Sequence, residues 1–359
     1  MVRRMILRPT AEQLRTLAFV AFGVVLAVAV WLQRTTIGDA LGQLWSMPVW
    51  IVGILVGLGV TERIVRADIY RSLLGGPSYG CALTVHDVGT AASKGIPMGG
   101  TLSTALRWSI ARDAAVPTTT FTVALVASGV AAMFVTWTLP LLALGLDLTQ
   151  RPAELTDLAV LGVCAVVLIG SGVFWAVVLG SDRVHRWSTH RCQRLCDRAA
   201  RRISAAEGLD PAAGLDEVRA GLRAVATRPW GLLARSTVAH TCGAVVLLVA
   251  LRGVGVGSEL GNIEFLRVFF IVTLLGSFIP TPGGVGVIEA GLTGALVASG
   301  VAPTMALAAV LVYRLITYVV PIVVGALLYV LWRARVKART TALSLPEFAR
   351  DPEFLPAAA

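Results

Sequence analysis

Six stretches of this chain are apolar over lengths that can cross a lipid bilayer. A spanning helix needs about 20 mainly apolar residues, because the hydrocarbon core is roughly 30 Å thick. Hydrophobic residues make up 56% of the 359 residues and charged residues only 14%, a balance typical of membrane proteins rather than soluble domains. The sequence therefore predicts an all-α polytopic membrane protein. Its predicted spans cover residues 17–33, 45–61, 118–145, 157–180, 231–251 and 303–332.

Basic residues are distributed unevenly among the segments that join these spans. Lys and Arg number 22 in residues 1–16, 62–72, 181–230 and 333–359 together, whereas the segments 33–44, 146–156 and 252–263 hold only Arg34, Arg151 and Arg252. Cytoplasmic segments of membrane proteins carry such an excess. We therefore expect both termini and the loop 181–230 to lie in the cytoplasm, with the protein in the cytoplasmic membrane. The net charge of +10 then favours anionic lipids at the cytoplasmic face and not nucleic acid.

Two further apolar stretches, residues 79–115 and 264–300, are interrupted by proline and glycine. Both contain Ile-Pro, then a Gly-Gly pair, then a helix of small residues and a long span. Counting spans from a cytoplasmic N-terminus places the two stretches on opposite sides of the membrane. This predicts an inverted repeat, each half having two spans, a broken or re-entrant hairpin and one more span. The predicted parts are a first repeat 1–150, a second repeat 151–337 and a disordered cytoplasmic tail 338–359.

The two breaks are candidate binding positions. Irregular backbone at membrane depth is tolerated where it lines a cavity or is packed in protein, and a helix that starts there directs its free N–H groups at an anion. Close helix packing at the Gly-Gly pairs is the alternative interpretation. The break residues are Pro97, Gly99 and Gly100 in the first hairpin and Pro280, Pro282, Gly283 and Gly284 in the second.

Ionisable residues within apolar segments are functional candidates, because burying them in a membrane costs free energy. We expect Glu289 just over one turn into the helix after the second break, and Arg314 near the middle of the last span beside Tyr313. An ion pair between Glu289 and Arg314 would reduce the cost of both. Such a pair is either structural, or it presents Arg314 to an anionic headgroup. Lys94 and Arg107 flank the first break, where they would make a cavity positive or extend to the interface.

Motifs of soluble enzymes are missing from the sequence, which has no nucleotide-binding loop, HExxH or GxSxG pattern. We therefore expect neither enzymatic activity nor a cofactor. Cys192 and Cys196 are interpreted as part of a reduced basic helix and not as metal ligands. His86 and Asp87 share a helical turn, which allows a proton relay.

The segment "SFIPTPGGVGVIEAGLTGALVASGV" and the following "YRLITYVVP" resemble the signature of the lysylphosphatidylglycerol synthase transmembrane-domain family. The first hairpin resembles the earlier proline-glycine segment of that family more loosely, since its usual Gly-Glu pair reads Gly100 and Thr101 here. The resemblance extends over roughly residues 15–335. The residues that match its signature are Pro280, Pro282, Gly283, Gly284, Gly286, Glu289, Tyr313, Arg314 and Pro321.

This resemblance implies a lipid flippase without the synthase domain, since only about 27 residues follow the last predicted span. The expected cargo is a polar-headgroup lipid, such as an anionic or aminoacylated phospholipid or a polyprenyl-phosphate-linked lipid. The alternative is a non-catalytic accessory protein that docks a glycosyltransferase or another lipid-modifying enzyme through the loop 181–230. Helix faces rich in glycine and alanine also permit a homodimer.

Overall fold

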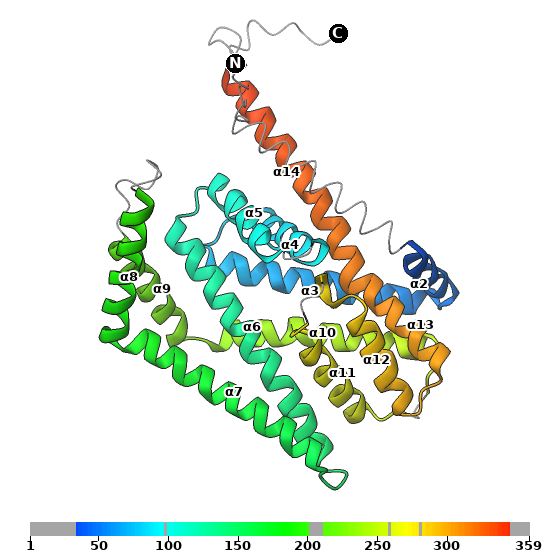
Figure 1. Cartoon of the computed structure of the whole chain (residues 1–359). Helices are drawn as coiled ribbons and strands as arrows, with labels where there is room; N and C mark the ends of the chain where they lie inside the picture. Colours follow the sequence, from blue (N-terminus) through cyan, green and yellow to red (C-terminus); the bar gives the residue numbers. More distant parts are fainter. Residues whose placement is uncertain (1–33, 97–98, 201–210, 258–259, 280–281, 345–359) are drawn as a thin grey trace, which may run out of the picture.

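The computed structural model describes residues 34–96, 99–200, 211–257, 260–279 and 282–344, and these residues form helices and no strand (Figure 1). The predicted span 17–33 lies outside them. The described helices long and apolar enough to cross a membrane contain four of the six predicted spans. They are α6 (Thr118–Asp147), α7 (Leu155–Gly180), α10 (Trp230–Gly253) and one continuous helix made of α13 (Pro303–Arg314), a π-helical turn (Leu315–Val319) and α14 (Val320–Ser344). The predicted all-α class is confirmed.

The predicted span 45–61 falls on two helices, α2 (Arg34–Ser46) and α3 (Val49–Leu73), which are separated at Pro48. Helix α3 continues well past residue 61, through the charged residues that we had counted as a cytoplasmic segment. In this part of α3, Glu62, Arg63 and Arg66 have charged partners inside the protein, as described below. Helix α3 packs along α10 and against α4.

Two helical hairpins lie in the interrupted stretches. The first consists of α4 (Tyr79–Gly95) and α5 (Gly100–Asp113), and the second of α11 (Asn262–Gly276) and α12 (Val287–Ala298). Each hairpin is followed by a long helix, α6 after the first and α13 after the second. The opposite orientation of the two halves stays a prediction.

Proline marks the start of several of these helices. Helix α3 follows Pro48, α6 follows Pro117, α10 follows Pro229, and α13 begins at Pro303. Proline suits this position because the first N–H groups of a helix lack partners in any case and the proline ring already fixes φ near its helical value.

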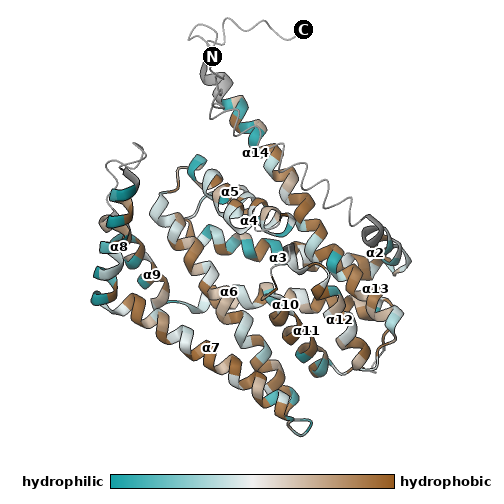
Figure 2. Ribbon diagram, viewed as in Figure 1, coloured by the Kyte–Doolittle hydropathy of each residue, from teal (hydrophilic) through white to brown (hydrophobic). Residues whose placement is uncertain are grey.

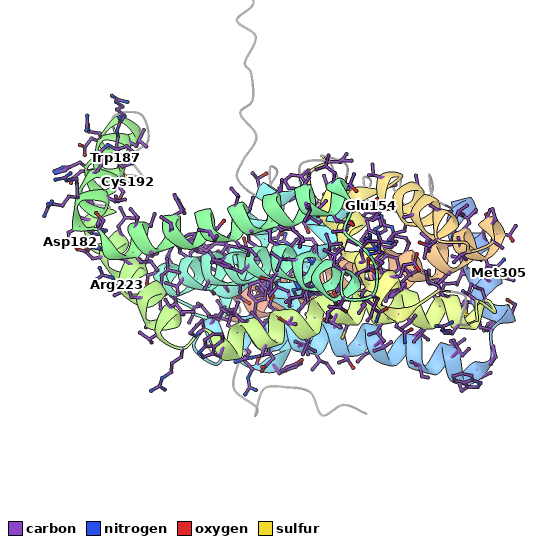
Figure 3. All side chains as sticks on the ribbon, turned by 90° about the horizontal axis from the view of Figure 1, so that it is seen from below. Glu154, Asp182, Trp187, Cys192, Arg223 and Met305 are labelled. Carbon is purple, nitrogen blue, oxygen red and sulfur yellow. The ribbon has the colours of Figure 1, made fainter. Side chains whose placement is uncertain are left out.

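In the basic segment 181–230 the structure describes two helices, α8 (Asp182–Ala200) and α9 (Pro211–Thr227), the first of which contains Cys192 and Cys196 as expected. Helix α9 packs on α6, and α8 projects at one end of the molecule with Trp187 and Cys192 on it (Figure 3). Figure 2 shows the contrast between hydrophilic α8 and apolar α7. Arg219 donates a hydrogen bond to Asp182 (Nη1–Oδ1 2.9 Å), which lowers the pKa of that carboxyl.

The C-terminal helix also differs from the prediction. Helix α14 continues to Ser344, beyond the predicted start of a disordered tail at residue 338. Residues 345–359 lie outside the described part of the chain.

Close contact between α4 and α14 depends on Gly325. A Cβ atom at this position would overlap the carbonyl oxygen of Asp87 and lie 2.7 Å from the Cβ of Ala91. The two backbones can therefore approach only because residue 325 has no side chain, as is common where membrane helices pack. This contact fixes the first hairpin against the last helix.

We predict that Gly325→Ala lowers the free energy of unfolding by about 1–3 kcal/mol, the usual cost of overpacking. Thermal melting of the purified protein in detergent measures the change. Gly170→Ala on α7 is the control, because a Cβ there would meet no atom within 4 Å, and it should leave stability unchanged or slightly higher. Equal melting temperatures for both variants would contradict the close approach of α4 and α14.

Candidate functional site

The second break is built from glycines with backbone angles that other residues rarely adopt. Gly283, Gly284 and Gly286 have φ values of +59°, +70° and +83°, in the left-handed region that favours glycine. A Cβ on Gly283 would also overlap the ring of Tyr318. Helix α12 therefore begins only at Val287, later than the sequence suggested.

Glu289 consequently lies in the first turn of α12 and not beyond it. Its Oε2 accepts a hydrogen bond from the backbone N–H of Gly286 at 2.8 Å. This bond satisfies one of the free N–H groups at the helix start, and the negative charge is favoured there by the helix dipole. The Glu289 side chain is 19% exposed.

Arg314 joins the second hairpin to the last helix. Its Nε donates to Glu289 Oε1 at 2.7 Å, and its Nη2 donates to the Gly283 carbonyl at 3.0 Å. The guanidinium carbon lies 4.3 Å from the ring centre of Tyr318, within the range of a cation–π contact. The predicted contact between Glu289 and Arg314 is therefore confirmed, and Arg314 is only 7% exposed.

The π-helical turn after Arg314 connects the two hairpins. Pro321 has no N–H, so it cannot donate to the Thr317 carbonyl four residues earlier. Lys94 of the first hairpin donates to that carbonyl instead, with its Nζ at 2.7 Å. The Tyr318 hydroxyl donates in return to the Lys94 carbonyl at 3.1 Å. The first break thus lies beside the second, across a turn of a type that often occurs at functional sites.

The first break uses its glycines differently. Gly99 has ordinary right-handed backbone angles, but a Cβ there would overlap the Ala92 carbonyl oxygen. Gly100 is the exposed first residue of α5. Pro97 and Pro280 lie outside the described residues, whereas Pro282 begins the 3₁₀ turn Pro282–Gly284.

Arg107 on α5 crosses α4 at Gly89, where any side chain would collide with it. Its Nη1 donates to the Tyr70 hydroxyl at 2.6 Å, and its guanidinium carbon lies 5.3 Å from the centre of the Tyr70 ring. Its Nε is buried and has no hydrogen-bond partner in the part of the chain that the structure describes. A buried donor without a partner costs free energy, which an anionic ligand would offset.

Two cavities meet at this position. The first cavity, of about 360 Å³, is lined by Arg63, Arg66, Lys94, Arg107, Glu62, His86 and further residues of α3 to α6, α10 and α14. The second cavity, of about 280 Å³, is lined by Arg314, Tyr313, Phe269, Gly283, Ile288 and further residues of α3, α4, α6 and α10 to α13. Glu62, Arg66 and Lys94 line both, so the cavities share a wall of charged side chains.

Five of the predicted residues therefore contact a cavity, Lys94 in both, Arg107 in the first, and Gly283, Tyr313 and Arg314 in the second. Glu289, Gly284, Gly99 and Gly100 are not part of either lining within the described residues. Glu289 reaches the second cavity only through Arg314.

The charges around the cavities are unequally compensated. Three arginines each contact a carboxylate: Arg63 pairs with buried Asp87, Arg66 with Glu62 at 2.8 Å, and Arg314 with Glu289 at 2.7 Å. Lys94 and Arg107 bond only to the neutral oxygens named above, and no described carboxylate lies within 4.0 Å of their charged nitrogens. The first cavity thus has a positive excess suited to a phosphate or carboxylate.

Sequence reasoning missed Glu62, Arg63 and Arg66. The distribution of basic residues predicts a cytoplasmic segment at 62–72, but these three residues lie on α3 and line the first cavity. A signal was present in the sequence, because no proline or glycine separates Val60 from Leu73 and the helix has no reason to end before the charges. Asp87, predicted as half of a proton relay with His86, binds Arg63; the relay itself stays a prediction.

Comparison with known proteins gives one family match. A family model described as the lysylphosphatidylglycerol synthase TM region matches residues 17–325. No curated protein and no solved structure matches the chain. The matched range includes both hairpins, both cavities and every basic residue that lines them.

Proposed function

Because this chain belongs to the lysylphosphatidylglycerol synthase TM-region family, we propose that it is a translocase that moves a lipid with a phosphate-bearing headgroup across the cytoplasmic membrane. The observation that carries the proposal is the first cavity, in which Lys94 and Arg107 have no carboxylate partner among the described residues. Cations placed at such cost among apolar helices are expected to bind a ligand or to line its path.

A phosphate is the chemistry that the candidate cargo lipids share. Anionic phospholipids, aminoacylated phospholipids and polyprenyl-phosphate-linked lipids all carry one, and Arg and Lys donors match its oxygens. Glu62, which lines both cavities, would face the ammonium group of an aminoacylated headgroup. The headgroup would occupy the first and second cavities, and the hydrocarbon chains would extend from them into apolar surroundings.

Movement of the two hairpins would give access from either leaflet. Gly99, Gly100, Gly283 and Gly284 would serve as hinges, since short segments at element ends absorb the backbone changes in such motions. The first break contacts the π-helical turn through hydrogen bonds of Lys94 with Thr317 and Tyr318. Because this turn also packs against the second break, movement of one hairpin would displace the other. Transport of this kind requires no bond to be made or broken and no cofactor.

The same proposal places both termini and the α8–α9 arm in the cytoplasm. The exposed residues of α8 include Arg183, Arg186, Arg191, Arg194 and Arg198. These would lie against anionic lipid headgroups, each contributing about 1 kcal/mol near such a surface.

Mass spectrometry of the lipids retained by the gently purified protein tests the function. Wild type should retain one class of phosphate-bearing lipid selectively. Lys94→Met should lose it, because the variant keeps the length of the side chain but not the charge, whereas Lys94→Arg should keep most of it. The same bulk phospholipids in all three proteins would contradict the proposal and favour the accessory alternative, for which a lipid-modifying enzyme should co-purify through α8 and α9.

A further inference from the structure

A third cavity of about 260 Å³ lies against the first one, beneath α9. It is bounded by Phe134 of α6, Trp175 and Leu179 of α7, Leu222 and Val225 of α9 and Leu232 of α10. Its described lining consists only of Ala, Val, Leu, Phe, Trp and Pro. Ala131 and Leu232 line both this cavity and the first, so an apolar compartment directly adjoins the most basic one.

We propose that the third cavity holds one hydrocarbon chain of the lipid whose headgroup occupies the first cavity. The inference rests on the proposed function and adds to it that the protein binds a hydrocarbon chain of the lipid as well as the headgroup. The basic first cavity suits a phosphate, and the adjoining apolar cavity suits a hydrocarbon chain. A lipid carries these two groups next to each other. Burial of each methylene there is favourable through the hydrophobic effect.

Helix α9 is positioned to form one wall of this compartment. Arg219 and Arg223 donate from their Nε atoms to the carbonyl of Leu179, at 3.0 and 2.8 Å. This carbonyl belongs to the last turn of α7, where backbone acceptors lack helical partners. Gly221 lets α9 approach α6, since a Cβ there would lie 2.7 Å from Val123 Cγ2. The basic residues of α9 thus hold its apolar face over the cavity.

The position of α9 over the cavity explains why this helix has an apolar face, which a loop surrounded by water would not need. The residues Leu222, Val225 and Ala226 all line the third cavity, whereas Arg223 and Ala224, between them in the sequence, lie outside its lining. The helix is therefore amphipathic, with its apolar face directed at α6 and α7.

Photo-crosslinking of the full chain in nanodiscs tests the inference. Two probes are used in separate samples, both phosphatidylglycerol, one with a diazirine at the end of an acyl chain and one with a diazirine in the headgroup. Peptide mapping should find the chain probe on Phe134, Trp175 or Leu222, and the headgroup probe on α3, α4 or α5.

Ala226→Trp supplies the test of occupancy. Ala226 is exposed and lines the third cavity, and we expect a tryptophan there to occupy part of it, so labelling by the chain probe should fall about tenfold, as expected when contact with a few buried methylenes is lost. Labelling by the headgroup probe should persist. Ala224→Trp is the matched control on the same helix, and it should leave both patterns unchanged.

The outcomes separate this inference from the proposed function. Chain labelling confined to the exposed face of α7, at Val166, Ile169 and Val173, with headgroup labelling still in the first cavity, would overturn the chain site alone. Chain labelling in the third cavity that Ala226→Trp does not reduce would overturn it as well. Absence of the headgroup label from the first cavity and of the chain label from the third cavity would overturn the proposed function together with the inference.

Discussion

Replacement of Arg314 by methionine is expected to abolish lipid transport and to lower the free energy of unfolding by about 3–5 kcal/mol, the usual cost of removing one partner of a buried ion pair. The variant leaves Glu289 without its cation and the Gly283 carbonyl without its donor. Both effects fall on the second break. Transport is measured in reconstituted vesicles with a fluorescent phosphatidylglycerol and a membrane-impermeant quencher, and stability by denaturation in detergent.

A double variant separates the two roles that the sequence left open for this pair. Arg314→Met combined with Glu289→Met removes both charges, so no carboxylate remains buried without a partner, and much of the lost stability should return. A purely structural pair would also recover transport. We expect transport to stay lost, because Arg314 lines the second cavity and its charge is needed there.

Arg335→Met is the control for a general loss of positive charge on the last helix, because Arg335 is exposed and lines neither cavity. It should transport as wild type does. Full activity of Arg314→Met would remove the central role assigned to this residue, whatever its stability.

The second hairpin could be anticipated from the sequence because its signals are local. Three glycines within four positions, 283 to 286, permit left-handed backbone angles, and the two prolines nearby disfavour a continuous helix. The pairing of Glu289 with Arg314 followed from the cost of burying either charge alone. The predicted start of α12 was too early. The irregular segment extends to Gly286 because its conformation depends on the fit of Gly283 against Tyr318, a contact between distant parts of the chain.

The basic residues of α3 could not be placed in the same way. Counting charges by segment gives the orientation of a membrane protein, but it does not distinguish a cytoplasmic arginine from one whose partner lies on another helix. Arg63 is half-buried beside Asp87 of α4, which is its partner. The sequence gives no sign of this partnership, since it arises only when α3 and α4 pack together.

The link between the two breaks shows where local reasoning stops. The absence of an N–H on Pro321 indicates that the Thr317 carbonyl needs another donor. That the donor is Lys94 follows only from the packing of α4 on α14. The sequence therefore predicts that the Thr317 carbonyl lacks its helical donor, whereas the identity of the replacement donor can be known only from the fold.

Replacement of Arg107 by methionine is expected to reduce transport of an anionic lipid about tenfold to a hundredfold while changing stability little. Hydrogen bonds to charged groups contribute about 1.5–3 kcal/mol each, and binding of the headgroup would lose one or more of them. Unlike Arg314, Arg107 leaves no carboxylate behind when it is removed. Among the described residues its one side-chain hydrogen bond is to the Tyr70 hydroxyl, and its buried Nε has no partner there to lose.

A large loss of transport together with a small change in melting temperature would indicate that Arg107 binds the headgroup and does not have a purely structural role. Arg112→Met on the same helix is the matched control, because Arg112 is exposed and outside both cavities, and it should behave as wild type. Arg107→Lys should recover part of the activity, since it restores the charge but not the planar fork of donors. If Arg107→Met instead melts several degrees lower and retains the lipids that wild type retains, Arg107 fastens α5 to Tyr70, and the anion is held by Lys94 and the arginines of α3.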